Sequence, residues 1–186
     1  MNKDPKPWQV LHSEYLYQHP PWLTVRKDKV QLPTGATIDD FYILEYPDWV
    51  SVLAITTDER MVVIRQHRHA LGRTHFELPA GVIDEEDGDP EIAARRELLE
   101  ETGFGGGQWQ PWMIGSANSA THTNLTHTYL AKNVTKVQEP QLDSGEDIQV
   151  HLLPLPEVRE LCLANAFVQS LHSAGILKYF LLHAQS

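Results

Sequence analysis

Residues 81–104 read GVIDEEDGDPEIAARRELLEETGF, a glycine loop that runs into a short helix with a capping residue at each end. Asp89 is a favourable N-cap, and Pro90 suits the first helical position, where an N–H group would have no helical partner. Gly103 supplies the left-handed residue that commonly ends a helix. The residues between these limits are nearly all strong helix formers, so the sequence predicts a helix over residues 90–102.

Carboxylates and apolar side chains divide the surface of this predicted helix. The residues of the expected apolar face are Ile92, Ala94, Leu98 and Leu99. Glu97, Glu100 and Glu101 lie at i, i+3 and i+4, so their carboxylates converge and repel one another. Arg96 can pair with Glu100, but one cation does not neutralise three carboxylates. A Glu-rich exposed helix is one interpretation, and a bound Mg²⁺ ion, which prefers oxygen ligands, is the other.

The residues around these carboxylates favour the metal interpretation. RELLEETGF at 96–104, preceded by ELPAG at 77–81, resembles the signature box of the Nudix hydrolases, a family that hydrolyses nucleoside diphosphates linked to another moiety. The second half of the box matches residue for residue. The first half is one residue longer than the family pattern, so either Asp87 or Glu86 is expected to take the acidic role that supports the box.

Length and composition indicate one domain of a soluble globular protein. The 186 residues suit a single domain over 1–186, with N-terminal strands over 1–46 and a catalytic core over 47–186. The net charge of −10 argues against a nucleic-acid-binding surface, and no apolar run is long enough to span a membrane. The N-terminus lacks a signal-peptide core, and the single cysteine, Cys162, is expected to be buried in a reducing cytoplasm. The ten histidines are scattered without the spacing of a zinc site.

The pattern of β-formers and turns predicts many strands and few helices. A hairpin is expected from strands over 23–30 and 38–46 joined by a turn at 32–35. Further strands are expected at 49–56, 61–64, 75–78, 109–116, 126–131 and 148–153. Two C-terminal helices are expected over 156–164 and 166–184. This order predicts an α+β fold, or α/β/α layers.

The resemblance extends beyond the box to the ADP-ribose and nucleotide-sugar pyrophosphatase branch of the family. The matching segments are VIRQHR at 63–68, FELPAG at 76–81 and SGEDIQVHLL at 144–153. The resemblance implies the Nudix fold, a mixed β-sheet sandwiched between helices with an N-terminal antiparallel hairpin. It also implies a homodimer in which the N-terminal strands help to complete the partner's substrate site.

Carried over position by position, the resemblance implies a site for Mg²⁺, or for Mn²⁺ in its place. The implied ligands are the backbone carbonyl of Ala80 and the carboxylates of Glu97, Glu100, Glu101 and Glu146. Glu146 is also an implied catalytic base, with Asp143 in the same loop as its rival, and Glu100 is implied as a ligand or as a base that orients water. The implied substrate contacts are Arg68, Arg65 and Glu77.

These residue types fit the chemistry of a pyrophosphate. Bound Mg²⁺ would neutralise phosphate charge and lower the pKa of a water, and arginine donates charge-assisted hydrogen bonds to phosphate oxygens. The implied substrate is ADP-ribose, cleaved to AMP and ribose 5-phosphate. The candidates for stacking on its base are Trp22, Phe41, Tyr42 and Trp49.

Three alternatives remain at this stage. The same chemistry could act on GDP-mannose or a dinucleotide. A Nudix module that senses ADP-ribose without cleaving it is a second alternative, against which the intact metal helix counts. A diphosphate isomerase of the same fold would need an active-site cysteine, whereas Cys162 lies in the predicted C-terminal helices.

Overall fold

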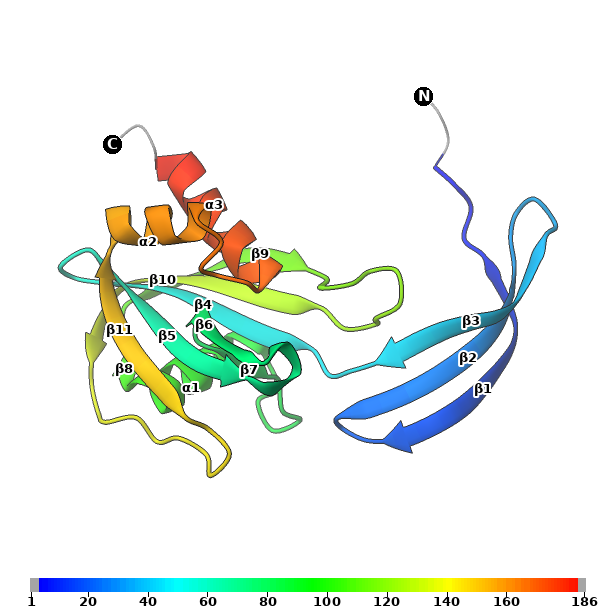
Figure 1. Cartoon of the computed structure of the whole chain (residues 1–186), viewed down its shortest axis with the longest axis horizontal. Coiled ribbons are helices and arrows are strands. Elements are labelled where there is room, and N and C mark those ends of the chain that lie inside the picture. The colour runs from blue at the N-terminus through cyan, green and yellow to red at the C-terminus, as the bar shows by residue number, and fades with distance from the viewer. Residues whose placement is uncertain (1–3, 184–186) are drawn as a thin grey trace. The chain divides into compact units, whose positions relative to one another are not determined.

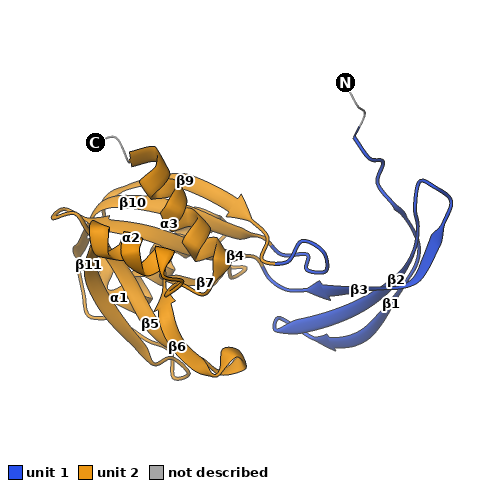
Figure 2. Cartoon of the chain, turned by 45° about the horizontal axis from the view of Figure 1, so that its top comes forward, with its two compact units in different colours: residues 1–47, 118–124 blue, residues 48–117, 125–186 orange. Residues whose placement is uncertain are grey.

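The computed structural model describes residues 4–183, which divide into two compact units (Figure 2). The smaller unit comprises the N-terminal residues up to Pro47 together with Asn118–Asn124. The larger unit comprises Asp48–Ala117 and the residues from Leu125 onward. The division after Pro47 lies one residue from the position at which the N-terminal strands were expected to end.

The smaller unit is a three-stranded antiparallel sheet in the order β1-β2-β3 (Figure 1). Its strands are β1 (Gln9–His19), β2 (Leu23–Gln31) and β3 (Thr37–Glu45). The predicted hairpin is confirmed as β2 and β3, and its turn closes with the Gly35 N–H donating to the Leu32 carbonyl at 2.9 Å. Gly35 has φ +89°, a left-handed conformation that suits glycine.

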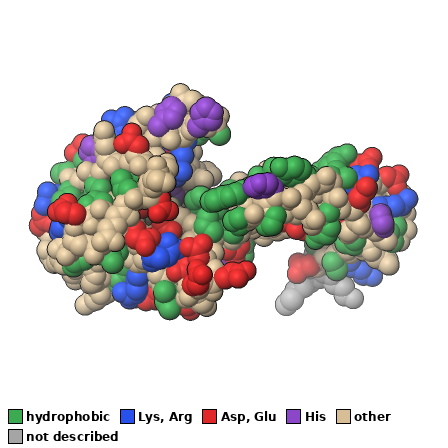
Figure 3. Space-filling model, turned by 90° about the horizontal axis from the view of Figure 1, so that it is seen from below, with side chains coloured by type: hydrophobic (Ala, Val, Ile, Leu, Met, Phe, Trp, Pro, Cys, Tyr) green, Lys and Arg blue, Asp and Glu red, His purple; other side chains and the backbone are tan. Residues whose placement is uncertain are grey.

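Strand β1 is exposed along its whole length, which is unusual for a strand with this composition. Its exposed large apolar side chains are Val10, Leu11, Tyr15, Leu16 and Tyr17. Figure 3 shows hydrophobic side chains along the surface of this unit. Exposed apolar side chains thus occur on both faces of this strand.

The larger unit is built on an eight-stranded mixed sheet whose backbone order is β11-β5-β4-β10-β8. Strand β10 pairs with β4 in parallel, and every other pairing in this sheet is antiparallel. The strands are β4 (Trp49–Thr56), β5 (Arg60–Arg68), β6 (Arg73–Glu77), β7 (Ala80–Val82), β8 (Phe104–Gly105), β9 (Gln108–Gly115), β10 (Thr126–Lys136) and β11 (Ile148–Pro154).

Helices cover both faces of this sheet (Figure 1). They are α1 (Pro90–Thr102), α2 (Leu155–Leu163) and α3 (Ser170–His183), with a short 3-10 turn at His69–Leu71. Alternate residues of β4 point to opposite cores. Val52 and Ala54 pack with Ala94 and Leu98 of α1, whereas the core of Leu53 and Ile55 includes Val158 of α2 and Ile176 of α3. The expected mixed sheet between helices is therefore confirmed.

Three local expectations are corrected. Ile92 of α1 is 54% exposed, and Ala93 takes the buried position instead. Strand β10 continues to Lys136 because Asn133, at φ +60°, absorbs a register shift that lets pairing resume. The last helix begins at Ser170, since Ala166 and Phe167 bridge to Phe76 in β6 rather than turning into a helix.

Two further observations concern exposure. Cys162 is buried, as predicted, at 4% exposed. Over the described residues, every helix is too short or too polar to cross a membrane.

Candidate active site

Helix α1 has both predicted caps. The Asp89 side chain accepts the Glu91 N–H at 2.7 Å, and Pro90 occupies the first turn. At the other end Gly103 adopts φ +72° and its N–H donates to the Leu99 carbonyl at 2.8 Å. These local signals fix where the helix begins and ends, and therefore where its glutamates lie.

The glycine at the start of the box loop makes room for one of those glutamates. A Cβ atom on Gly81 would lie 2.2 Å from the carboxyl carbon of Glu97. Any larger residue here would displace the Glu97 carboxyl group, so glycine lets this carboxylate lie directly against β7. The sequence pattern has glycine here for this close approach.

Glu97 and Glu101 are buried, which the sequence did not predict for charged helix residues. They are 9% and 3% exposed. Burial raises the pKa of Glu97 to about 7, and nearby Glu100 and Glu146 act in the same direction while Arg96 opposes them. Burial also raises the pKa of Glu101 well above its usual value, although its carboxylate accepts the Ala80 N–H at 2.9 Å. The two carboxylates therefore carry a large unfavourable free energy when both are ionised.

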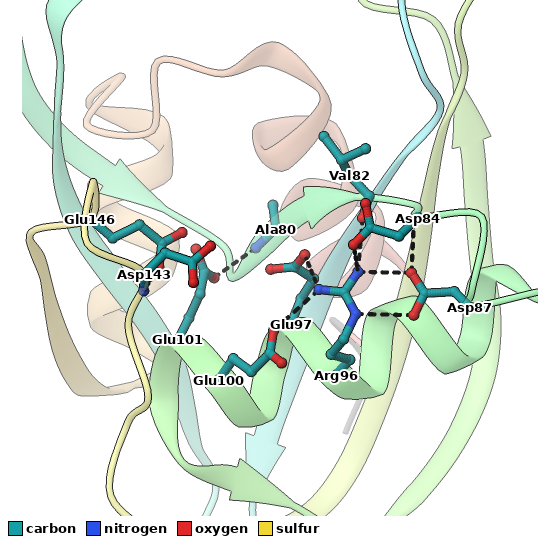
Figure 4. Close-up of polar contacts among 10 residues, drawn as sticks. All are labelled: Ala80, Val82, Asp84, Asp87, Arg96, Glu97, Glu100, Glu101, Asp143 and Glu146. Atoms are coloured by element: carbon teal, nitrogen blue, oxygen red, sulfur yellow. Dashed lines mark hydrogen bonds and ion pairs between the residues drawn. The ribbon is translucent and has the colours of Figure 1, made fainter. Parts of the chain in front are cut away.

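Arg96 is the cation at the centre of this acidic group (Figure 4). Its guanidinium forms two hydrogen bonds to Asp87, at 3.0 and 2.8 Å, and donates to the Val82 carbonyl at 3.0 Å. It also contacts Glu97 at 2.7 Å and Glu100 at 3.1 Å. Because one guanidinium is shared among several acids, it does not offset the burial of Glu97.

Asp87 takes the supporting acidic role that the sequence left open between two residues. Asp87 is buried and accepts the Asp84 N–H at 2.9 Å in addition to its bonds from Arg96, whose hydrogen bonds lower the pKa of Asp87. Glu86 is exposed. The extra residue in the first half of the box thus lies in the loop before α1, and Asp87 still pairs with Arg96.

The loop before β11 brings a further carboxylate to the site. Its backbone forms a turn in which the Glu146 N–H donates to the Asp143 carbonyl at 3.0 Å, and the Glu146 carboxylate accepts the Asp143 N–H at 3.0 Å. Figure 4 shows both side chains reaching from the loop toward Glu101. The charge of Glu146 raises the pKa of Glu97 and of Glu101, which places it within electrostatic reach of both.

Arg68 and Glu77 bind each other. The guanidinium of Arg68 donates to the two carboxylate oxygens of Glu77 at 2.8 and 2.6 Å. Burial raises the pKa of Glu77, but the hydrogen bonds and charge of Arg68, with smaller contributions from His172 and His75, together leave this pKa below its usual value. The charges of Glu101 and Glu146 act on Arg68, so this cation faces the carboxylates of α1.

Arg65 is not brought to this group. Strand alternation directs residues three apart to opposite faces, and the Arg65 guanidinium lies 5.0 Å from the ring centroid of Phe76. Phe76 in turn contacts Phe167, on the face covered by α2 and α3. The structure thus gathers the predicted carboxylates, Arg68 and Glu77, and separates Arg65 from them.

Two histidines that the sequence did not single out lie behind the box loop. His172 of α3 is buried, and its Nδ1 accepts the Leu78 N–H at 3.2 Å. Burial lowers the pKa of His172 to about 4, which keeps it neutral and able to accept this bond. The Nδ1 atom of buried His75 lies 3.4 Å from a carboxylate oxygen of Glu77. The sequence could not reveal the contact of His172, since His172 and Leu78 are 94 residues apart.

The donor set suits a hard divalent cation. Within residues 4–183 no three His, Cys, Asp or Glu side chains are assembled so that they could hold a metal ion. Each carboxylate instead has a protein partner: Glu97 has Arg96, Glu101 has Ala80, and Glu146 has Asp143. Buried carboxylates with raised pKa values nonetheless match the oxygen ligands that Mg²⁺ prefers, because a cation would remove the penalty of ionising them.

Comparison with known proteins agrees with this geometry. Two family profiles match the chain: the nucleoside diphosphate sugar hydrolase N-terminal domain over residues 8–44, and the NUDIX domain over residues 46–171. The chain belongs to the Nudix hydrolase family. A crystal structure of an ADP compounds hydrolase shares the fold of this Nudix hydrolase, with a TM-score of 0.84, 19% identity, and coverage of 100% of this chain and 99% of the other.

The curated relatives of this Nudix hydrolase include pyrophosphatases. An ADP-ribose pyrophosphatase of Mycobacterium tuberculosis is 29% identical over 91% of this chain and 79% of its own length. An ADP-sugar pyrophosphatase of Mus musculus is 32% identical over 78% of this chain and 73% of its own. A methanol dehydrogenase activator of Bacillus methanolicus is 36% identical over 70% of each protein.

Proposed function

We propose that this Nudix hydrolase cleaves the pyrophosphate bond of a nucleoside diphosphate sugar in a Mg²⁺-dependent reaction, with ADP-ribose as the substrate and AMP and ribose 5-phosphate as the products. The observation that carries the proposal is the burial of Glu97 and Glu101 beside Glu146, opposite the cation of Arg68. The pyrophosphatases among the relatives support the substrate class.

Five groups would hold the metal: the carboxylates of Glu97, Glu100, Glu101 and Glu146, and the backbone carbonyl of Ala80. When bound, Mg²⁺, or Mn²⁺ in its place, supplies neutralisation of phosphate charge and a water of lowered pKa. Arg96 keeps two bonds to Asp87 and one to Val82 that do not involve the ligands. It can therefore hold the box loop in place while Glu97 and Glu100 turn to a metal.

Arg68 and Glu146 have distinct roles in the proposed reaction. Arg68 binds Glu77 through Nε and Nη2, which leaves Nη1 without a hydrogen bond to the described residues and able to donate to a phosphate oxygen. Glu146 lies on a loop that its own turn preorganises, and it is the proposed base that takes the proton of the attacking water. Glu100, the most exposed of the helix carboxylates, is the proposed orienting group.

We also propose that the protein is a homodimer whose contact surface includes β1. The apolar side chains of β1 are exposed, and the described residues of the smaller unit include no helix of their own. Three strands without a covered apolar face rarely form a stable unit alone. The aromatic candidates for base stacking divide between the two units: Trp22, Phe41 and Tyr42 belong to the smaller one, and Trp49 opens β4 of the larger.

The test of the function is a phosphatase-coupled assay of phosphate release from a substrate panel, with and without Mg²⁺. The panel contains ADP-ribose, GDP-mannose, UDP-glucose, NADH and a diadenosine polyphosphate. Metal-dependent turnover of ADP-ribose well above the others supports the proposal. Preferred turnover of another compound would keep the chemistry and replace the substrate, whereas binding of ADP-ribose without cleavage would identify a sensing module.

A further inference from the structure

His75 lies in β6 two residues before Glu77, on the strand face that carries the Arg68–Glu77 pair. The register of β5 and β6 pairs Ile64 with Glu77 and Gln66 with His75. Arg68 follows Gln66 by two residues on the same face, so its side chain must reach back past the Gln66–His75 pair to meet Glu77. The Gln66–His75 pair therefore lies between the positions of Arg68 and Glu77 on this face, and we term these two the floor residues.

Both floor residues carry buried polar atoms without hydrogen-bond partners. They are Nε2 of His75, a residue only 7% exposed, and Oε1 of Gln66. Buried polar groups in folded proteins nearly always have hydrogen-bond partners, and each buried group without one destabilises the folded state. Leucine would fill the position of His75 without that cost. Stability alone thus gives no reason for a histidine here.

The other ring nitrogen of His75 supplies a reason. Nδ1 lies 3.4 Å from Oε1 of Glu77, the same oxygen that accepts the Nε–H of Arg68. The same Nδ1 lies 3.4 Å from the Phe76 carbonyl oxygen, so the imidazole lies against both the Glu77 carboxylate and the backbone of β6. His172 Nδ1 accepts the backbone N–H of Leu78, the residue that follows Glu77.

We propose that His75 is a positioning residue for substrate binding: it holds Glu77, and through Glu77 it keeps the Nη1 edge of Arg68 turned toward the phosphates of a nucleoside diphosphate. The inference rests on the proposed function in naming the phosphates as the ligand. His75 itself touches neither the substrate nor the carboxylates of α1. Its effect therefore passes entirely through Arg68.

The matched variants are His75→Asn and His75→Leu. Asparagine places an N–H donor near the position of Nδ1, whereas leucine has a similar volume and no donor. We expect His75→Leu to raise KM for the nucleotide sugar about tenfold, the scale of losing a polar contact to a charged group, with kcat changed much less. His75→Asn should restore most of the loss. The melting temperature of His75→Leu should equal or exceed that of the wild type, because a buried unpaired nitrogen is removed.

A double-mutant cycle shows through which residue His75 acts. In an Arg68→Ala background, His75→Leu should cause no further change in KM, since the group it positions is gone. His67→Ala is the control: His67 lies one residue from Arg68, on the opposite strand face, and its Nδ1 lies 3.4 Å from Thr74 Oγ1. It should leave KM unchanged. A tenfold loss that persists without Arg68, or a fall in melting temperature that accounts for lost activity, would overturn the proposal.

Calorimetric binding of ADP without metal separates this inference from the proposed function. ADP presents the same two phosphates to Arg68, and His75→Leu should weaken its binding while His75→Asn should not. Turnover of the wild type without any effect of His75→Leu would overturn the positioning role alone. Absence of turnover, with ADP binding still sensitive to His75→Leu, would overturn the hydrolase proposal alone. A wild type that neither binds ADP nor turns over would overturn both.

Discussion

The two units of the molecule each place one class of side chain against the usual rule, and they do so in opposite ways. In the smaller unit, apolar side chains of β1 are exposed, while the charges of β2 pair at the surface, as Lys27 does with Glu14 at 3.1 Å. In the larger unit the apolar side chains are buried in two cores, but so are Glu97 and Glu101. Departures of this kind are expected at functional sites.

The two departures indicate a different kind of binding partner for each unit. Contact with another protein surface would remove the free-energy cost of exposing an apolar strand. A bound cation would remove the cost of ionising buried carboxylates. The smaller unit therefore points to a second polypeptide and the larger one to a metal. The predictions below test these two assignments separately.

The largest effect is expected from removing one buried charge. Glu101→Gln should lower kcat about a thousandfold, the scale of losing a principal electrostatic group from an active site. It should also stabilise the metal-free protein, because glutamine still accepts the Ala80 N–H without an ionised carboxylate being buried. Steady-state kinetics and metal-free thermal unfolding measure the two effects. Glu157→Gln, at an exposed acid of α2, is the control and should change neither.

A smaller loss of activity is expected when a substitution displaces the Glu97 carboxylate instead of removing a carboxylate. The Cβ of Gly81→Ala would lie 2.2 Å from the Glu97 carboxyl carbon, but that group ends a flexible side chain and can move away. Activity should therefore fall about tenfold to a hundredfold with little loss of stability, by analogy with displacing a ligand's support. Gly175→Ala, in α3 with only ordinary contacts, is the matched control and should leave activity unchanged. Equal loss of stability and activity would contradict this account of Gly81.

The next effect concerns the smaller unit. Replacing two exposed residues of β1, Leu16→Asp and Tyr17→Asp, should convert a dimer into a monomer because like charges would face the covered surface. Light scattering after size exclusion gives the mass directly. Asp39→Asn, at an exposed paired acid of β3, is a control that should leave the dimer intact. A wild type that runs as a monomer would refute the assignment of β1.

The smallest effect is a dependence of stability on pH. The pKa of Glu97 rises from 4.5 to about 7 on folding. Below pH 4.5 both states hold the proton, and between the two values only the folded state holds it. The free energy of unfolding of the metal-free protein should therefore fall as the pH rises from 4.5 to about 7, with no further loss from this group at higher pH. Denaturant unfolding in EDTA measures it. Glu97→Gln should flatten the profile, and an unchanged slope in that variant would assign the dependence elsewhere.

The helix and its caps were predictable because their signals are local. Asp89, Pro90 and Gly103 act within one turn of their own positions, and the structure shows each in the expected role. The burial of Glu97 and Glu101 was not predictable, since it depends on β7 and on a loop some 45 residues further along the chain. From the helix pattern alone, a glutamate is assigned to the polar face and is therefore expected to be exposed. Burial of the carboxylates is thus the part of the site that only tertiary structure supplies.

The arginines show a signal that was present and unused. Arg65 and Arg68 are three apart in a strand, so alternation alone requires them to face opposite sides of the sheet. Only one of them could meet the carboxylates of α1. The same alternation places His75 and Glu77, two apart in a predicted strand, on one face. The role of His172 had no such signal, because it depends on a contact between α3 and a residue 94 positions earlier.

Calorimetric titration of Mg²⁺ at pH 7 tests directly whether the buried carboxylates bind a cation. The heat should be measured in two buffers of different ionisation enthalpy. Because the pKa of Glu97 is about 7 in the metal-free protein, binding should release protons, and the two heats should differ accordingly. Glu97→Gln should reduce that difference. Equal heats in both buffers, or no binding at millimolar Mg²⁺, would contradict the claim.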